Sequence, residues 1–189
     1  MLDLESARQA FTVDVRHRPT QVILDPDLRL FRRLLPDEAP PILRQVMVDQ
    51  TTETILLPEN GDARSAAETL ASKMQNRVPK LVARMDGSGL PAVPLLVIGV
   101  ADQVDAWLAK NHLPGRPDII KEKGSAQAWT VRRPDGFTLA VVSALDAASL
   151  SALARPLPHY GRQSYIVFDG AKAISRGAWP TRSQVLMLD

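Results

Sequence analysis

The chain of 189 residues contains no cysteine, and this absence excludes disulfide bridges, thiolate zinc sites and cysteine nucleophiles together. The formal net charge is only +2 and no block of five like charges occurs, so we do not expect a nucleic-acid partner. No apolar run approaches the roughly 18 residues of a membrane span. The first ten residues lack the apolar core of a signal peptide, and the sequence predicts no compartment.

The sequence also lacks the motifs that mark common catalytic sites. Neither glycine-rich phosphate motif, G-x-G-x-x-G or G-x-x-x-x-G-K-[ST], occurs, and the hydrolase motif G-x-S-x-G is missing as well. The three histidines, His17, His112 and His159, do not have a zinc-binding spacing such as H-E-x-x-H. We therefore predict no catalytic, cofactor-binding or metal-ligating residue, and no cofactor, in this chain.

Short apolar runs alternate with helix-like patterns along most of the sequence. Strands are expected at four places: within 53–60, 93–100, 126–145 (a hairpin that turns at residues 134–136) and 164–170, the last paired with residues 171–179. Three aspartates are expected to cap helices: Asp62, Asp102 and Asp146. This alternation predicts an α/β fold, a three-layer, mostly parallel open sheet of Rossmann or flavodoxin-like type with one antiparallel hairpin.

The N-terminal part of the chain predicts a short β segment followed by a connection. Residues 11–26 are expected to form one or two short strands, which end at Asp25-Pro26. A helix-like spacing follows over 28–35 and ends at Pro36. The prolines at 36, 40 and 41 favour an extended linker, because a proline disfavours helix in the residue before it.

Residues 156–170, PLPHYGRQSYIVFDG, combine residues that turn a chain with residues that carry chemistry. His159 and Tyr160 could form a general acid–base pair beside Ser164, since histidine titrates near neutral pH. A structural role explains the same residues, because the prolines end a helix, Gly161 permits a positive φ and the two rings cover the sheet edge. The stretch also precedes its strand, whereas open α/β sheets bind ligands after theirs. We interpret it as a structural corner, with His159 and Tyr160 as candidate ligand or docking contacts.

The three tryptophans differ in their surroundings. Trp107 and Trp129 have apolar neighbours and are expected in the core or against the sheet. Trp179 lies near Gly177 and Pro180 and is a candidate docking anchor, since tryptophan is favoured at protein interfaces.

Two segments resemble a known enzyme family. Residues 153–180, LARPLPHYGRQSYIVFDGAKAISRGAWP, resemble the C-terminal segment of some bacterial zinc aminopeptidases of the aminopeptidase N-like kind, the gluzincin aminopeptidases. In that segment a turn and strand of the form LPHYGkySylvF-G precede a kG-W ending. Residues 25–43, DPDLRLFRRLLPDEAPPIL, are similar to the join at which a β-domain of those enzymes leads into a terminal α/β domain.

The resemblance implies a division of the chain into a strand tail of a preceding β-domain plus linker, 1–28, and an accessory α/β domain, 29–189. Those peptidases bind zinc through H-E-x-x-H and a downstream glutamate, which this chain lacks, so no catalytic or metal residue is carried over. The catalytic domain and its zinc would lie elsewhere in a longer protein. A strand edge left open by the missing strands would then be available for self-association with a second copy.

Three functional hypotheses follow from these observations. The leading one is a noncatalytic C-terminal module, not an enzyme by itself, that packs against or restricts access to the catalytic domain of a larger metallopeptidase-like protein. Its partners would be the catalytic and β domains of that protein. An alternative is a small-molecule-binding flavodoxin-like domain that uses the loops after residues 57, 100 and 144. A third is a stand-alone hydrolase that uses His159, Tyr160 and Ser164.

Overall fold

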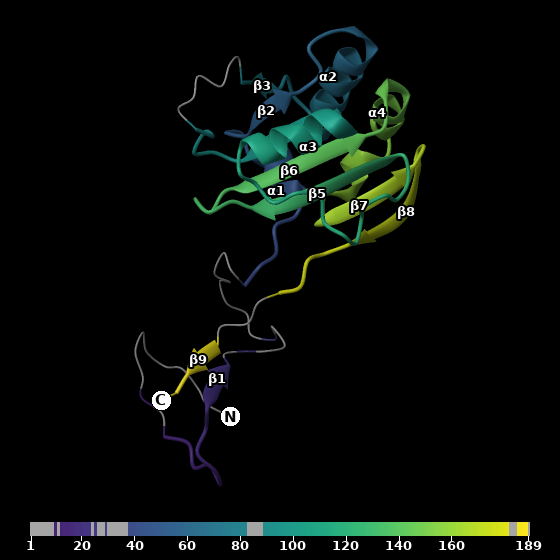
Figure 1. The fold of residues 1–189 in the computed structure, drawn as a ribbon. Helices are drawn as coiled ribbons and strands as arrows, with labels where there is room; N and C mark the ends of the chain where they lie inside the picture. Colours follow the sequence, from purple (N-terminus) through teal and green to yellow (C-terminus); the bar gives the residue numbers. More distant parts are fainter. Residues whose placement is uncertain are drawn as a thin grey trace.

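The described part of the chain forms a mixed α/β structure with one large sheet, four α-helices and a separate small sheet (Figure 1). The computed structural model describes residues 10, 12–23, 25, 29, 38–82, 89–181 and 185–188. The α/β class expected from the alternating sequence pattern is confirmed. Among the described residues, no helix has the length and apolarity needed to cross a membrane.

The large sheet has seven strands in the order β3-β2-β4-β6-β5-β7-β8. Their bounds are β2 Glu53–Leu56, β3 Lys80–Leu81, β4 Leu95–Val100, β5 Ala126–Arg132, β6 Thr138–Ala144, β7 Tyr165–Asp169 and β8 Lys172–Gly177. The strands expected within 53–60, 93–100 and 164–170, the hairpin within 126–145 and the pairing of 171–179 with the last strand are all present.

The sheet is mixed rather than mostly parallel, and this corrects the expectation from sequence. The pairs β3–β2, β2–β4 and β4–β6 are parallel, whereas the pairs β6–β5, β5–β7 and β7–β8 are antiparallel. The cause is the short turn between β5 and β6, which forces these strands to be antiparallel. Strand β7 pairs antiparallel with β5, and the two-residue connection after β7 makes β7–β8 a second antiparallel hairpin.

Four α-helices and one 3-10 turn connect the strands. They are α1 Arg44–Val48, α2 Gly61–Gln75, α3 Ala101–Lys110, α4 Ala147–Leu153 and η1 Leu157–Tyr160. Helix α1 directly follows the prolines at 40 and 41 that were expected to form an extended linker, and the sequence did not predict this helix. Its first turn is held by the backbone N–H of Leu43, which donates to the Gln163 carbonyl at 2.9 Å.

The helix starts only partly match the predicted caps. Asp146 caps α4 as expected, because its carboxylate accepts a hydrogen bond from the backbone N–H of Ser149 at 2.8 Å. The other two assignments are wrong: α2 is capped at Asn60 and α3 at Val100, in each case without a side-chain hydrogen bond. Asp62 and Asp102 lie in the first turn instead, where a carboxylate is favoured by the helix dipole.

The cap at Asp146 gives the stability of the fold a defined pH dependence. The hydrogen bond from the Ser149 backbone holds the pKa of Asp146 below its ordinary value of 3.8. A lowered folded-state pKa means that the carboxylate stabilises the fold above about pH 3.8 and that this contribution is lost as the pH falls through the lowered value. We expect Asp146→Ala to lower the Tm at pH 7, whereas Asp146→Asn, which keeps a capping oxygen, lowers it less. In thermal melts from pH 7 to pH 3, the gap between wild type and Asp146→Asn should shrink; a constant gap would contradict this cap.

The central strands are buried on both sides, and each side has its own apolar cluster. Alternate residues of β4 separate accordingly: Leu96 and Ile98 pack with α1, α2 and α4, whereas Leu95 and Val97 pack with α3. Figure 1 shows α3 lying across the sheet at the level of β6. Trp129 is fully buried in the α3-side cluster and Trp107 is half-buried against it, as expected for both.

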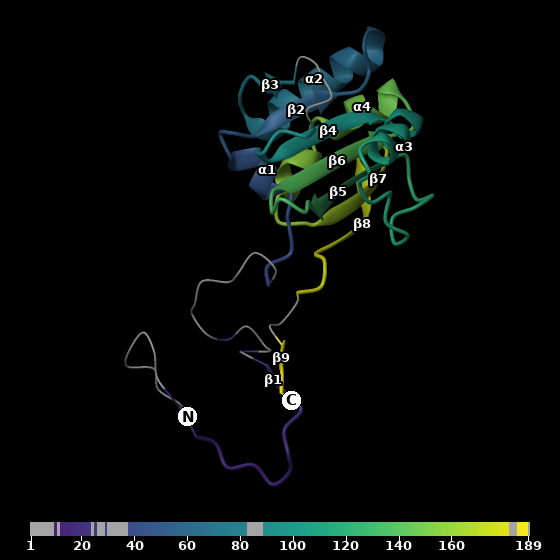
Figure 2. The same cartoon turned by 60° about the vertical axis from the view of Figure 1, so that its left-hand side comes forward.

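A second, two-stranded sheet lies apart from the seven-stranded sheet in both views (Figures 1 and 2). It pairs β1 Gln21–Ile23 antiparallel with β9 Val185–Met187 and is called the terminal ribbon below. The short N-terminal β segment is thus confirmed at 21–23, while residues 12–20 form no strand. The helix-like pattern at 28–35 and Pro36 lie outside the described residues, apart from Arg29.

Candidate functional site

The corner that joins α4 to β7 is built largely as a structural turn. Helix α4 ends at Leu153, and Pro156 opens η1, whose Leu157 is fully buried. The expected positive φ at Gly161 is wrong, because its φ is −55°. Glycine is needed there for close packing: a Cβ would lie 3.3 Å from the Cβ of Arg44, whose backbone N–H donates to the Gly161 carbonyl at 2.7 Å.

Ser164 does not share a site with His159 and Tyr160. Its side chain is fully buried, and its hydroxyl donates to the Pro41 carbonyl at 2.7 Å. Thr130 donates to the same carbonyl at 2.7 Å, so the two hydroxyls together fasten the segment before α1 to the sheet. The structure therefore gives Ser164 a fastening role and leaves His159 exposed at the surface.

His159 and Tyr160 line a depression of about 450 Å³ beside α1, called the corner depression below. Its lining residues come from α1, from the η1 turn and from β8: Arg44, Met47, Val48, Pro158, His159, Tyr160, Gly161, Arg162, Gln163 and Arg176. The depression lies at the edge of the sheet where β7 begins, which is opposite to the edge where parallel strands usually present ligand sites.

The corner depression is cationic. Three arginines and one histidine line it, and no carboxylate does. Within the described parts of the chain, Arg44, Arg162 and Arg176 form no ion pair. The Arg176 guanidinium lies over the Tyr160 ring, 5.5 Å from its centroid, and Tyr160 in turn meets Phe168 edge to face at 5.7 Å.

Sequence reasoning found His159 and Tyr160 but missed the arginines. Arg44 follows the predicted linker, in a stretch for which the sequence predicted no element, and Arg176 is separated from Tyr160 by the whole of β7 and the following turn. Their convergence depends on the β7–β8 pairing and on the packing of α1 against Gly161. Only Arg162, next to the corner motif in sequence, offered a local signal.

Trp179 lies away from the corner depression, on the side of the sheet that α3 covers. Its ring stacks on Tyr165 with centroids 4.8 Å apart, and its indole N–H donates to the Thr130 carbonyl at 2.9 Å. The side chain is half-buried against the α3-side core. The structure thus uses Trp179 to fasten the chain after β8 onto the sheet.

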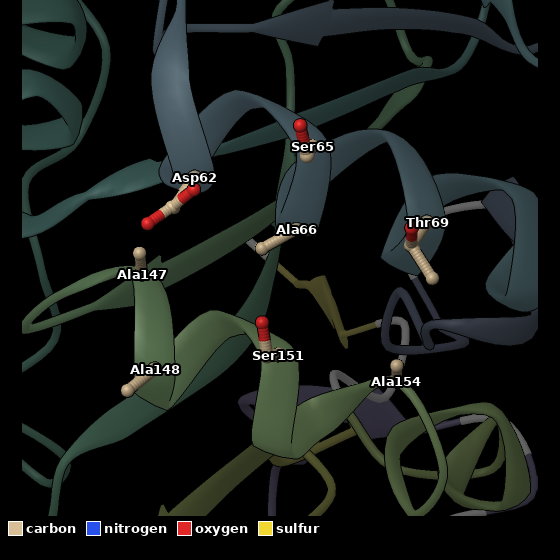
Figure 3. Close-up of a pocket in the computed structure, with 8 residues that line it drawn as sticks. All are labelled: Asp62, Ser65, Ala66, Thr69, Ala147, Ala148, Ser151 and Ala154. Atoms are coloured by element: carbon tan, nitrogen blue, oxygen red, sulfur yellow. The ribbon is translucent and has the colours of Figure 1, made fainter.

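A groove between α2 and α4 lies on the opposite edge, near two of the loops named as a candidate ligand site (Figure 3). The two helices run in the same direction, so Asp62 lies near Ala147 at one end and Thr69 near Ala154 at the other (Figure 3). Small side chains line the groove, with one carboxylate and no cation. This lining does not suit a phosphate-bearing ligand.

Arg116 lies at the end of the sheet where β6 ends and β5 begins. Its guanidinium donates to the Ser143 hydroxyl at 3.0 Å and to the Gln127 amide oxygen, and it meets the Asp105 carboxylate at 3.1 Å. The same group lies 5.4 Å from the centroid of the Trp129 ring. These contacts satisfy Arg116 within the fold and fasten the chain between α3 and β5 to the end of the sheet.

The terminal ribbon is the most apolar exposed part of the described chain. Five of the fourteen large hydrophobic residues that are exposed among the described residues lie in it: Val22, Ile23, Val185, Leu186 and Met187. Three more lie outside the two strands, at Val13, Val15 and Leu188. The exposed fractions reach 65% at Leu186 and 72% at Met187. Contiguous exposed apolar surface of this kind marks interaction sites in soluble proteins.

No group of three or more histidine, cysteine, aspartate or glutamate side chains that could hold a metal occurs in the described part of the chain. The candidate site residues lie at two separate places. His159 and Tyr160 line the corner depression, and Trp179 lies on the side of the sheet that α3 covers. In comparisons with known proteins, no family model matches the chain and no curated protein is found as a relative.

Proposed function

We propose that this chain is a noncatalytic module of a larger, metallopeptidase-like protein and that it packs against, or restricts access to, a catalytic domain outside the chain. The two segments that resemble aminopeptidase N-like enzymes, 25–43 and 153–180, motivate the class of protein. The catalytic zinc would belong to that other domain. The geometry of the corner does not favour the hydrolase hypothesis, because the Ser164 hydroxyl is buried and donates to Pro41.

The terminal ribbon is the observation that carries this proposal. All six residues of β1 and β9 are exposed, including Val22 and Leu186. A two-stranded ribbon is at best marginally stable alone in water and needs further strands or a packed face. In the proposed module, the ribbon packs on the β-domain that precedes it, and the apolar side chains are buried there.

The fold of residues 38–181 fits a supporting role for such a module. We propose a three-layer, Rossmann or flavodoxin-like arrangement, in which α2 and α4 pack on one side of the sheet and α3 on the other. The groove between α2 and α4 lacks a cation, and Arg116 fills the carboxyl edge between β5 and β6. Neither feature favours the hypothesis of a domain that binds a phosphate-bearing cofactor, and both are consistent with a noncatalytic module.

The proposal predicts a longer native polypeptide. An antibody raised against this chain should detect, in a lysate of the source cells, a band well above the 20.7 kDa of the chain. In the longer protein, Leu186→Lys should lower the Tm, because the side chain is buried against the β-domain. The matched control is Leu145→Lys, which changes a leucine of the same exposure, 66% against 65%, away from the ribbon and should leave the Tm unchanged.

Two results would overturn the proposal. The first is a single band near 20.7 kDa, which would mean that the chain acts alone. The second is hydrolysis of aminoacyl p-nitroanilides by the isolated chain, abolished by a chelator. Equal effects of Leu186→Lys and Leu145→Lys in the longer protein would remove the role assigned to the terminal ribbon.

A further inference from the structure

The corner depression holds positive charge that the described chain does not neutralise. Arg44, Arg162 and Arg176 are exposed, and His159 adds a fourth basic side chain to the same lining. Guanidinium groups repel one another when they converge, so a surface that gathers them without a carboxylate gains most from an anionic ligand.

The fold positions two of these arginines, Arg176 and Arg44, before any ligand binds. The Tyr160 ring supports the Arg176 guanidinium at 5.5 Å and is itself braced by Phe168. Arg44 belongs to α1, whose backbone is fixed to Gly161 by a hydrogen bond of 2.7 Å. A ligand therefore meets an Arg176 side chain whose freedom is already reduced, which lowers the entropy lost on binding.

The lining also indicates the chemistry of the ligand. Planar guanidinium groups bind carboxylate and phosphate oxygens through paired hydrogen bonds. Met47, Val48 and Pro158 add an apolar wall, and the volume of about 450 Å³ exceeds that of a single inorganic ion. A polypeptide segment offers both carboxylates and the aliphatic stems of glutamates. Nucleic acid fits less well, because Arg176 lies over the Tyr160 ring on which a base would stack.

We propose that the corner depression binds the carboxylates of an acidic polypeptide segment. Arg44, Arg162 and Arg176 hold the carboxylate oxygens, while Met47 and Val48 contact the aliphatic part of the segment. The site uses none of the residues of the terminal ribbon. Its test is therefore independent of the proposal that the chain belongs to a longer protein.

The test measures binding of a fluorescein-labelled oligoglutamate peptide of about ten residues to the isolated chain by fluorescence anisotropy. We expect saturable binding that weakens as NaCl rises from about 50 mM to about 500 mM. Arg162→Gln and Arg176→Gln should each weaken it roughly tenfold. Arg176→Lys, which keeps the charge but loses the planar fork, should fall between wild type and Arg176→Gln.

The matched control is Lys110→Gln, which removes one exposed positive charge from the end of α3, on the other side of the sheet. This variant should bind oligoglutamate as the wild type does. Equal weakening by Lys110→Gln and Arg176→Gln would overturn the site, since binding would then follow net charge alone. Preference for inorganic phosphate or for phosphatidylserine vesicles over oligoglutamate would overturn the choice of a polypeptide ligand.

Discussion

Replacing Gly124 with alanine is expected to destabilise the protein by about 3 kcal/mol or more. Gly124 has a φ of +64°, a backbone conformation that costs an L-residue roughly 1 kcal/mol. A methyl group there would also overlap the backbone carbonyl of Phe168 in β7 and lie 2.9 Å from the Cγ1 of Val167. The neighbouring Ser125 is bonded to β7 on the same side, because its N–H donates to the Phe168 carbonyl at 2.8 Å. The overlap therefore cannot be relieved without moving a central strand.

Gly170→Ala is the matched control for this prediction. Gly170 has a φ of +56°, close to that of Gly124, but a Cβ at Gly170 would meet no atom within 4 Å. Gly170→Ala should lower the free energy of unfolding by only the roughly 1 kcal/mol that the backbone strain costs. Urea unfolding followed by far-UV circular dichroism gives both free energies of unfolding. If the two variants lose the same stability, the close approach of Gly124 to β7 is not present in solution.

Trp129→Ala is expected to cost about 3–5 kcal/mol, because the ring is fully buried at the centre of the sheet. In β5, Trp129 pairs with Val141 of β6 and Tyr165 of β7, and it packs in the α3-side cluster. Its removal would leave a large cavity between α3 and three strands. Urea unfolding by far-UV circular dichroism measures the loss without relying on tryptophan fluorescence.

Two further variants, Trp129→Phe and Trp107→Ala, test how far the loss at Trp129 depends on the buried ring. The indole N–H of Trp129 is buried and has no acceptor in the described chain, so Trp129→Phe removes a buried, unsatisfied donor along with part of the ring. Trp129→Phe should lower the free energy of unfolding by less than about 1.5 kcal/mol. Trp107→Ala, at a half-buried position of α3, should also cost less than Trp129→Ala. A loss at Trp107 as large as that at Trp129 would contradict the central place assigned to Trp129.

Periodicity in the sequence was sufficient to locate most strands and helices, but not to determine how the strands pair. The apolar run at 93–100 and the turn residues at 134–136 each specify their own element, so β4 and the β5–β6 hairpin were predictable. The place of β7 in the sheet is different: β7 runs parallel to β6, but it pairs with β5 instead of with β6. Side-chain packing across the sheet determines which strand β7 pairs with, and the local sequence pattern contains no information about it.

The residues of the corner illustrate the same limit at the scale of single side chains. Asp146 caps α4 through a bond to a residue three positions away, which is a local arrangement that sequence can predict. The role of Gly161 depends instead on Arg44, more than a hundred residues earlier, and the convergence of Arg176 with Arg44 depends on tertiary structure. For this reason the sequence indicated His159 and Tyr160, with Arg162 close by, but it did not indicate that Arg44 and Arg176 lie beside them.

The two halves of the seven-stranded sheet differ in how far apart along the chain their paired strands lie. In the antiparallel half, β7 and β8 are joined by two residues and β5 and β6 by five. In the parallel half, β2 and β4 pair only after α2, β3 and the following connection have been traversed. Closing the longer loops loses more chain entropy before any contact forms. We therefore expect the two hairpins to form first and the docking of β2 and β4 onto β6 to set the overall folding rate.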